Sequence, residues 1–280
     1  PYYIYENVDS LFNKNSFLPY KIITSDFVIA ISYDQSKAVL YRDASMIKLL
    51  NETFQKQLNI ATPICHTFHP TPAEYLASTF APNEDLDADT IYELFYQPCF
   101  PSFCPDDILL DRLNTDIIPP EMQNVIVDYF SKIRAQYQNK HISFTLEGLN
   151  YFMETGRVTE IPDFMYSYLT PPQRLTMLKA IVASVDDGSF TPHIIRSEKL
   201  TVPSPICICA PNEHKVIIYY FSPDKGQYIF SLQELSLVQA FYDFLTYLHE
   251  SPLVYSLDES KAMLHNVLEK YQQHPNFLQS

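Results

Sequence analysis

The sequence predicts an α+β fold with two lobes, in which each lobe has an antiparallel β-hairpin packed by a helix and a mainly helical region joins them. Three observations support this prediction. Two segments are patterned like half-buried strands, a helical pattern follows each, and helical patterns fill most of the sequence between them. We expect residues 1–118 to form the N-terminal α+β lobe, and residues 119–280 to contain the helical middle region and the C-terminal α+β lobe.

The length and apolar content of the chain agree with two lobes. A chain of 280 residues with 46% hydrophobic residues can bury a large core, at a length where one core tends to divide into two. The most hydrophobic segments, "SDFVIAIS" and "KVIIYYFS", have the length of strands and fall short of the roughly 18 residues that a membrane-spanning helix requires. We therefore expect a soluble protein.

The first hairpin is predicted near the N-terminus. Residues 27–33 alternate and are rich in Val and Ile, "DQSK" has the composition of a turn, and "AVLYR" reads as the returning strand. Asp43 is a suitable N-cap for the helix that follows, whose apolar positions recur at helical spacing at Ile47, Leu50, Phe54 and Leu58.

The second hairpin is predicted in "KVIIYYFSPDKGQYIF", with the turn at residues 224–226. Ser231 and Glu234 have the spacing of a capping box for the next helix, whose apolar face comprises Leu235, Val238, Phe241, Tyr242, Leu245 and Leu248. Aligning the two hairpins places Val28 with Val216, Lys37 with Lys225 and Asp43 with Ser231. Either two copies of one unit or two independent amphipathic hairpins would give this pattern.

The middle region and the C-terminus carry well-marked helices. "PPEMQNVIVDYFSKIRAQYQ" places apolar residues on one side of a helix. In "TPPQRLTMLKAIVASV", Thr170 is the predicted N-cap, Pro171 the first helical residue and Gln173 the partner that completes a capping box. Ser256 and Glu259 predict a further capping box for the last helix.

Composition argues against several classes of function. A net charge of −14 would repel the phosphates of a nucleic acid. The four glycines lie far apart, whereas phosphate-binding loops need clustered glycines. Five cysteines, an odd number in a chain of this length, favour reduced thiols and a cytoplasmic location.

Several residues are candidates for metal binding. Cys65, His66 and His69 could bind zinc together with Cys99 and Cys104, but the spacing differs from paired zinc knuckles and favours ordinary loop residues. Cys207 and Cys209 would lie on one face of a strand, where packing in the core is the favoured interpretation. The spacing of Asp85, Asp87 and Asp89 is that of a calcium loop, but Thr90 replaces the required Gly and Tyr96 the required Glu, which favours a solvated acidic loop.

Catalytic and ligand-binding residues are less clearly marked. The sequence has neither G-x-S-x-G nor H-E-x-x-H. A Cys/His pair such as Cys99 with His141 stays open, because such partners meet only in space. Tyr129, Arg134 and Tyr137 could hold an amphipathic ligand or could belong to a core face. We expect no catalytic residues, no metal site and no cofactor, and we assign no ligand-binding residues.

Two segments carry a resemblance to a known class of protein. "FTLEGLNYFMETGRVTEIPDFMY" and "FSLQELSLVQAFYDFLTYLHESPLVYSLDES" resemble the sensor or effector region that follows an N-terminal helix-turn-helix domain in transcriptional regulators of low-GC Gram-positive bacteria. The resemblance covers the second half of the chain and the first hairpin. It implies a small-molecule or peptide effector, a homodimer, and DNA contact through a domain outside this sequence.

The start of the chain agrees with that expectation. It opens at Pro1 rather than Met, and "PYYIYENVDS" lacks the features of a signal peptide, so we expect a preceding segment. Two alternatives stay open: a cytoplasmic enzyme with a Cys/His or carboxylate site, and a pure protein-interaction domain.

Overall fold

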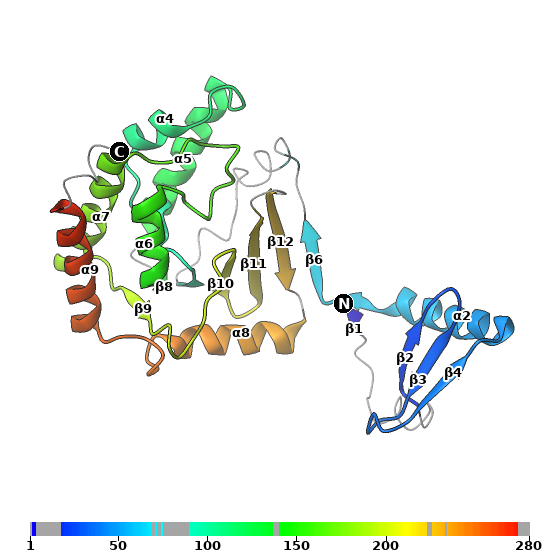
Figure 1. Cartoon of the computed structure of the whole chain (residues 1–280). Helices are drawn as coiled ribbons and strands as arrows, with labels where there is room; N and C mark the ends of the chain where they lie inside the picture. The colour runs from blue at the N-terminus through cyan, green and yellow to red at the C-terminus, as the bar shows by residue number, and fades with distance from the viewer. Residues whose placement is uncertain are drawn as a thin grey trace. The chain divides into compact units, whose positions relative to one another are not determined.

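The chain folds into two compact units of mixed helix and sheet, residues 1–65 and 66–280 (Figure 1). The computed structural model describes residues 2–3, 18–68, 71, 74, 90–136, 140–222, 226–232 and 234–273. The predicted α+β class with two lobes is confirmed. No helix in these described ranges is both long enough and apolar enough to cross a bilayer.

The first unit contains a three-stranded antiparallel sheet and one long helix. Its strands, in the order β2-β3-β4, are Tyr20–Ile23, Val28–Ile31 and Ala38–Tyr41, and α2 covers Ala44–Ile60. The short strands β1 (Tyr2–Tyr3) and β5 (Thr62–Pro63) pair separately. The backbone N–H of Met46 donates to Asp43 Oδ1 over 3.0 Å, which confirms Asp43 as the N-cap.

The second unit is built on a seven-stranded sheet of order β6-β12-β11-β10-β7-β8-β9. In that order the strands are Cys65–Phe68, Gly226–Leu232, Lys215–Ser222, Ile206–Asn212, Ile91–Leu94, Lys140–Thr145 and His193–Ile195. Strands β12, β11, β10 and β7 pair antiparallel, whereas β7, β8 and β9 pair parallel. Each parallel pair needs a long crossover, and helices supply it.

Helices lie on both sides of this sheet. The crossover from β7 to β8 contains the 3-10 turn η2 (Phe100–Ser102), α4 (Asp106–Arg112) and α5 (Pro120–Gln136), and that from β8 to β9 contains α6 (Leu146–Thr155) and α7 (Pro171–Asp186). Helix α8 (Leu235–Leu248) runs across β7, β10 and β11, and α9 (Leu257–Gln272) packs on α7 and β9 (Figure 1).

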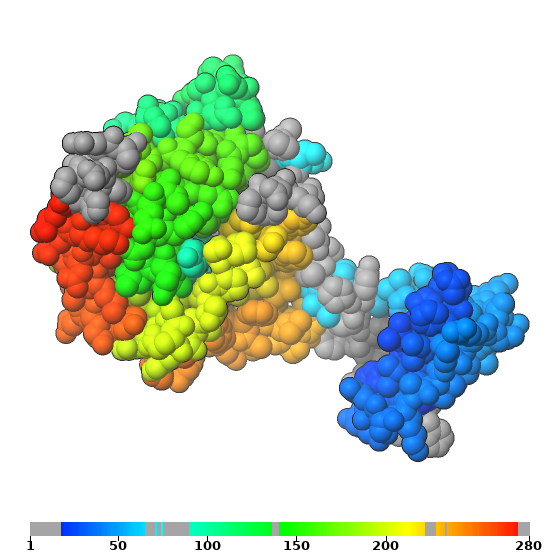
Figure 2. Space-filling view, in the orientation of Figure 1, coloured from blue at the N-terminus to red at the C-terminus, as the bar shows by residue number. Residues whose placement is uncertain are grey.

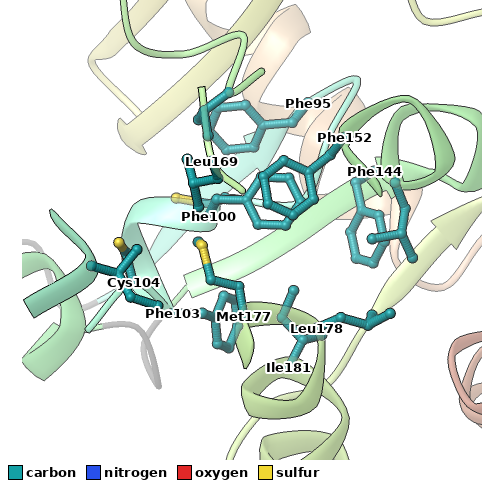
Figure 3. Close-up of a cluster of buried hydrophobic side chains, with 14 of the residues drawn as sticks. Phe95, Phe100, Phe103, Cys104, Phe144, Phe152, Leu169, Met177, Leu178 and Ile181 are labelled. Atoms are coloured by element: carbon teal, nitrogen blue, oxygen red, sulfur yellow. The ribbon is translucent and has the colours of Figure 1, made fainter. Parts of the chain in front are cut away.

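The large hydrophobic core lies between the sheet and helices α4 to α7 and α9. Phe100 and Phe152 stack at its centre with ring centroids 3.6 Å apart, and Phe144 of β8 lies near them (Figure 3). Ile142 and Phe144 are fully buried on this side of β8, so the alternate residues of the strand face the other side. The two faces of β7 and β8 therefore have different environments.

The compact units do not divide at the expected boundary of residue 118. The division falls between Cys65 and His66, because β7 lies between β10 and β8 in the sheet and the crossover after β7 packs in the same core. The middle region is also less purely helical than expected, since it contains β8 and β9.

The helix caps of the second unit agree with the sequence in two of three cases. The capping boxes of Thr170 with Gln173 and of Ser256 with Glu259 are both present. The predicted box of Ser231 with Glu234 is wrong, because β12 continues through Ser231 to Leu232. Glu234 is itself the N-cap of α8, and its carboxylate accepts hydrogen bonds from the backbone N–H groups of Ser236 and Leu237.

Candidate functional site

Three histidines from distant parts of the sequence converge in the second unit. His141 lies in β8, His193 is the first residue of β9, and His249 is the C-cap of α8. One ring nitrogen from each lies within 4.8 Å of the others. We refer to these three residues as the histidine cluster.

The parallel pairing of β8 and β9 places two of these side chains on one face. Ser143 is the register partner of His193, and His141, two residues before Ser143, points to the same side of the sheet. This is the face that α8 covers, so the last turn of α8 brings His249 to the pair.

The segment after α8 holds His249 against β9. The backbone N–H of Tyr255 donates to the carbonyl of Ile194 and that of Arg196 donates to the carbonyl of Leu253, both over 2.8 Å. An isolated bridge also pairs Ile195 with Val254, and the yellow segment that contains β10 adjoins the orange helix α8 (Figure 2). Backbone pairing therefore fixes the place where the three elements meet.

The imidazole rings are stacked. The centroids of His193 and His249 are 4.1 Å apart with the planes 8° from parallel, and those of His141 and His249 are 4.8 Å apart at 25°. Tyr92 of β7 stacks on the outer side of His141 at 4.9 Å, and Tyr242 of α8 meets Tyr92 edge-on. The cluster thus has an aromatic wall on one side.

Burial and mutual proximity keep these imidazoles neutral. Burial, and then the neighbouring His141, lowers the pKa of His193 to about 4. Burial, and then His193 and His141, lowers the pKa of His249 to about 3, and burial also lowers the pKa of His141. Near pH 7 each ring therefore has one nitrogen lone pair available to accept a hydrogen bond or to ligate a metal ion.

A second polar cluster lies on the opposite, fully buried face of β7 and β8. Lys140 Nζ donates to Glu93 Oε1 over 3.2 Å, and the Cys209 thiol lies 3.8 Å from the same oxygen. Burial alone would lower the pKa of Lys140, but Glu93, Cys99 and Cys209 together outweigh that effect and raise the pKa. Burial, and then Glu93, raises the pKa of Glu160 well above its ordinary value, so Glu160 is a neutral acid.

Three of the cysteines singled out in the sequence are core residues, whereas Cys209 is half-buried beside Glu93. Cys99, Cys104 and Cys207 are buried free thiols, and burial raises the pKa of each, that of Cys104 to about 12. The preference for core packing of Cys207 on β10 is confirmed.

The structure does not bring Cys99 and His141 together. Cys99 lies within electrostatic range of Lys140 and Glu93, on the buried face, whereas His141 stacks with Tyr92 on the other face. Alternation along β8 separates them, because neighbouring residues of a strand point to opposite sides. Cys99 and His141 therefore do not form the Cys/His pair that the sequence left open.

The other candidates from the sequence divide into two groups. Tyr129 packs beside the buried polar cluster, and Arg134 donates to the Cys104 carbonyl over 2.8 Å and pairs with Asp106. These contacts place both residues in the framework of the second unit. Tyr137, His69 and the three aspartates lie outside the described residues, as do the side chains of Cys65 and His66.

Two hollows can be described in the part of the chain that the structure covers. A cavity of about 30 Å³, about the volume of one water molecule, lies among apolar side chains that include Phe100, Phe130 and Tyr166. A groove of about 670 Å³ on the first unit is open to solvent and is lined mainly by polar residues of α2 and the turn before β3. Neither has the form of an enclosed, aromatic-lined pocket for an organic ligand.

The histidine cluster is not predictable from the sequence. More than 50 residues separate each member from the next, and no short motif contains two of them. The sequence marks only His141, as a possible partner for a thiol. The sequence signal that the three residues share is a histidine at or near the end of an element. Such histidines are too common for this signal to identify these three.

No family model matches this chain, and no curated protein or solved structure matches it either. Function therefore has to be inferred from the geometry of the site and from the sequence.

Proposed function

We propose that this chain is the non-catalytic sensor or effector region of a bacterial transcriptional regulator, located in the cytoplasm, and that it receives its signal at the histidine cluster. The region would form a homodimer and would act on DNA through a domain outside this sequence. The observation that carries the proposal is the convergence of three neutral imidazoles from β8, β9 and the end of α8.

The position of the cluster supports a link with the regulator resemblance. The two segments that carry the resemblance cover residues 144–166 and 230–260. The first begins directly after the stretch of β8 that contains His141, and the second contains His249. A ligand bound by the cluster would therefore connect the two resembling segments, which is the arrangement that a sensor needs to convert binding into a change of shape.

The state of the thiols and of the buried carboxyl group supports a non-catalytic role. A nucleophilic cysteine must be a thiolate, but burial holds Cys99, Cys104 and Cys207 in the neutral form. Glu160 is a neutral acid inside the protein, on the face that lies away from the histidines. The net charge of −14 also supports leaving DNA contact to another domain.

One observation favours a second candidate, a metal-dependent hydrolase. Some catalytic zinc sites have three histidine ligands and one coordination position that is open to water. In such sites the metal-bound water attacks the substrate. The same geometry would serve a sensor that binds a ligand without reaction, so activity must be measured.

The test is genome-wide DNA occupancy of the natural protein that carries this chain, tagged in its own host. We expect occupancy at discrete promoters, and we expect His193→Ala and His249→Ala to change the expression of the adjacent genes. His214→Ala is the matched control, because His214 is an exposed histidine that pairs with Glu213 away from the cluster. Absence of specific occupancy, or hydrolysis that depends on the cluster, would contradict the proposal.

A further inference from the structure

We propose that His141, His193 and His249 together bind one divalent transition metal ion of the zinc type through one ring nitrogen each. We further propose that this ion is the signal that the region senses, and this second statement rests on the proposed function. The proposal concerns a single site in the second unit, formed by β8, β9 and the C-terminus of α8.

The distances between the histidine nitrogens are close to those of a metal site. Zinc binds histidine nitrogen at about 2.0–2.1 Å, so two nitrogens on one tetrahedral ion are about 3.4 Å apart. The three ring nitrogens already lie within 4.8 Å of one another. Binding thus requires the ring nitrogens to come about 1.4 Å closer together, and rotation of the rings about their side-chain torsions can supply that approach.

The stacking identifies which movement is needed. A metal ion lies in the plane of each imidazole that binds it, and two stacked parallel rings do not share such a point. The planes of His193 and His249 are 8° from parallel, so at least one of these rings must turn when the ion binds. His249 is the C-cap of α8, where the chain leaves the helix, and is only half-buried, so we assign this turn to its ring.

The donor set selects the class of metal. Imidazole nitrogen suits zinc, copper, nickel and iron, whereas magnesium and calcium prefer oxygen ligands. Three protein ligands leave a fourth tetrahedral position, and His141 is the most exposed of the three. We therefore expect a water molecule as the fourth ligand.

The surroundings favour a cation over an anion. The carbonyl end of α8 lies at His249, and the C-terminus of a helix has a partial negative charge. The net charge of −14 attracts divalent cations to the protein as a whole.

Of the two hollows among the described residues, neither suits an organic effector, whereas the histidine cluster suits a metal ion. The cavity beside Phe100 holds about 30 Å³, and the open groove of the first unit is lined by polar side chains. Bound organic ligands usually fill pockets of about 300 Å³ or more. The histidine cluster needs only enough room for one ion and the water molecule that completes its coordination.

The experiment is a titration of the tag-free 280-residue chain with Co²⁺ alone, followed by displacement with Zn²⁺. We expect one Co²⁺ per chain, with the visible absorption of tetrahedral coordination, and loss of that absorption when Zn²⁺ is added. His193→Ala and His249→Gln should each weaken Co²⁺ binding at least about tenfold, since even loss of a residue that only supports a ligand has a tenfold effect or more. His214→Ala and His265→Ala, which change histidines paired with Glu213 and Asp186, should bind like the unchanged chain.

Two variants are used because His193 lies deeper than His249. If circular dichroism shows that His193→Ala is unfolded, the half-buried His249→Gln decides the question. Binding that survives in every folded cluster variant, or the absence of stoichiometric binding by the unchanged chain, would overturn the metal site.

The two proposals fail in different ways. If the chain binds no metal but its natural protein occupies promoters, the regulatory function stands and the metal does not. If the chain binds metal and hydrolyses a substrate but never associates with DNA, the metal site stands and the regulatory function does not.

Discussion

Glu160 is the residue whose environment is most at odds with its ordinary charge. Its Oε1 is buried and has no hydrogen-bond partner among the described residues, and the same holds for Oε2 of Glu93. Burial raises the pKa of Glu160, and the negative charge of Glu93 raises it further. A second carboxylate beside Glu93 would be strongly unfavourable, so the protonated form of Glu160 is the one that fits the fold.

This environment predicts a pH-dependent gain of stability in Glu160→Gln. A carboxyl group whose pKa is higher in the folded than in the unfolded state binds more protons when folded, so stability falls as the pH rises from the unfolded pKa toward the folded one. One such group changes the free energy of unfolding by up to about 1.4 kcal/mol per pH unit. Glutamine resembles the neutral acid and does not titrate. Urea denaturation should therefore show that the variant and the unchanged chain have similar free energies of unfolding at pH 4.5. At pH 6, and more so at pH 8, the free energy of unfolding of the variant should be the higher of the two.

The control for that measurement is Glu198→Gln, which changes an exposed glutamate outside the buried cluster. It should leave the free energy of unfolding unchanged within about 0.5 kcal/mol at each pH. A Glu160→Gln variant that loses stability at pH 8 would show that the ionised carboxylate is the native form.

At the scale of elements, the sequence predicted the two hairpins and the starts of α2, α7 and α9 but missed strands β7, β8 and β9. Local sequence patterns are enough to predict an element when its interaction partner is near in sequence. Examples are the pairing of β11 with β12 and the capping box of Ser256. In β7 and β8, Glu93 and Lys140 look like surface charges, and only their pairing 47 residues apart allows both to be buried. The histidine cluster escaped prediction for the same reason, because its members meet only through strand register and a helix end.

The pair of Glu93 and Lys140 predicts a non-additive mutational effect. Lys140→Met should lower the free energy of unfolding by about 3–5 kcal/mol, because it leaves the buried carboxylate of Glu93 without its partner. The double variant Glu93→Gln with Lys140→Met removes both charges and should recover most of that loss. Chemical denaturation of the two single variants and the double variant gives the coupling free energy. Additive effects would mean that the two side chains do not interact in the folded protein.

The start of α6 predicts a second effect at this scale. A Cβ atom on Gly148 would lie 1.8 Å from the carbonyl oxygen of Tyr96, so the backbone of that segment can approach α6 only because residue 148 is glycine. Gly148→Ala should lower the free energy of unfolding by about 3 kcal/mol or more, since a rigid backbone must move. Gly188→Ala is the control, because that glycine has a φ of +79° but open space around it. We expect about 1 kcal/mol there, from the left-handed conformation alone. Equal effects at both sites would contradict the close contact.

At the scale of the whole molecule, the two units differ greatly in how much they bury. All members of the large hydrophobic core belong to the second unit, from Phe95 to Tyr271. In the described part of the first unit, Val28 and Ala30 are the buried residues, and α2 has none. The predicted apolar stripe of α2 is therefore only partly covered by its own sheet, and hydrophobic burial within this unit gives it little stability.

This difference predicts that the second unit folds alone. A fragment that begins at Cys65 keeps all of β6 and the whole core, so it should unfold in one cooperative transition. Because a change of 1 kcal/mol shifts the melting temperature of a domain of this size by about 2–4 °C, we expect its midpoint within about 5 °C of that of the full chain. The complementary fragment of residues 1–64 should show no cooperative transition, because the core formed by its described residues is too small to offset the entropy of folding. Differential scanning calorimetry of both fragments and the full chain measures this directly. A second-unit fragment that is unfolded, or a residue 1–64 fragment that melts cooperatively, would mean that the stability of the protein is not concentrated in the core around Phe100 and Phe152.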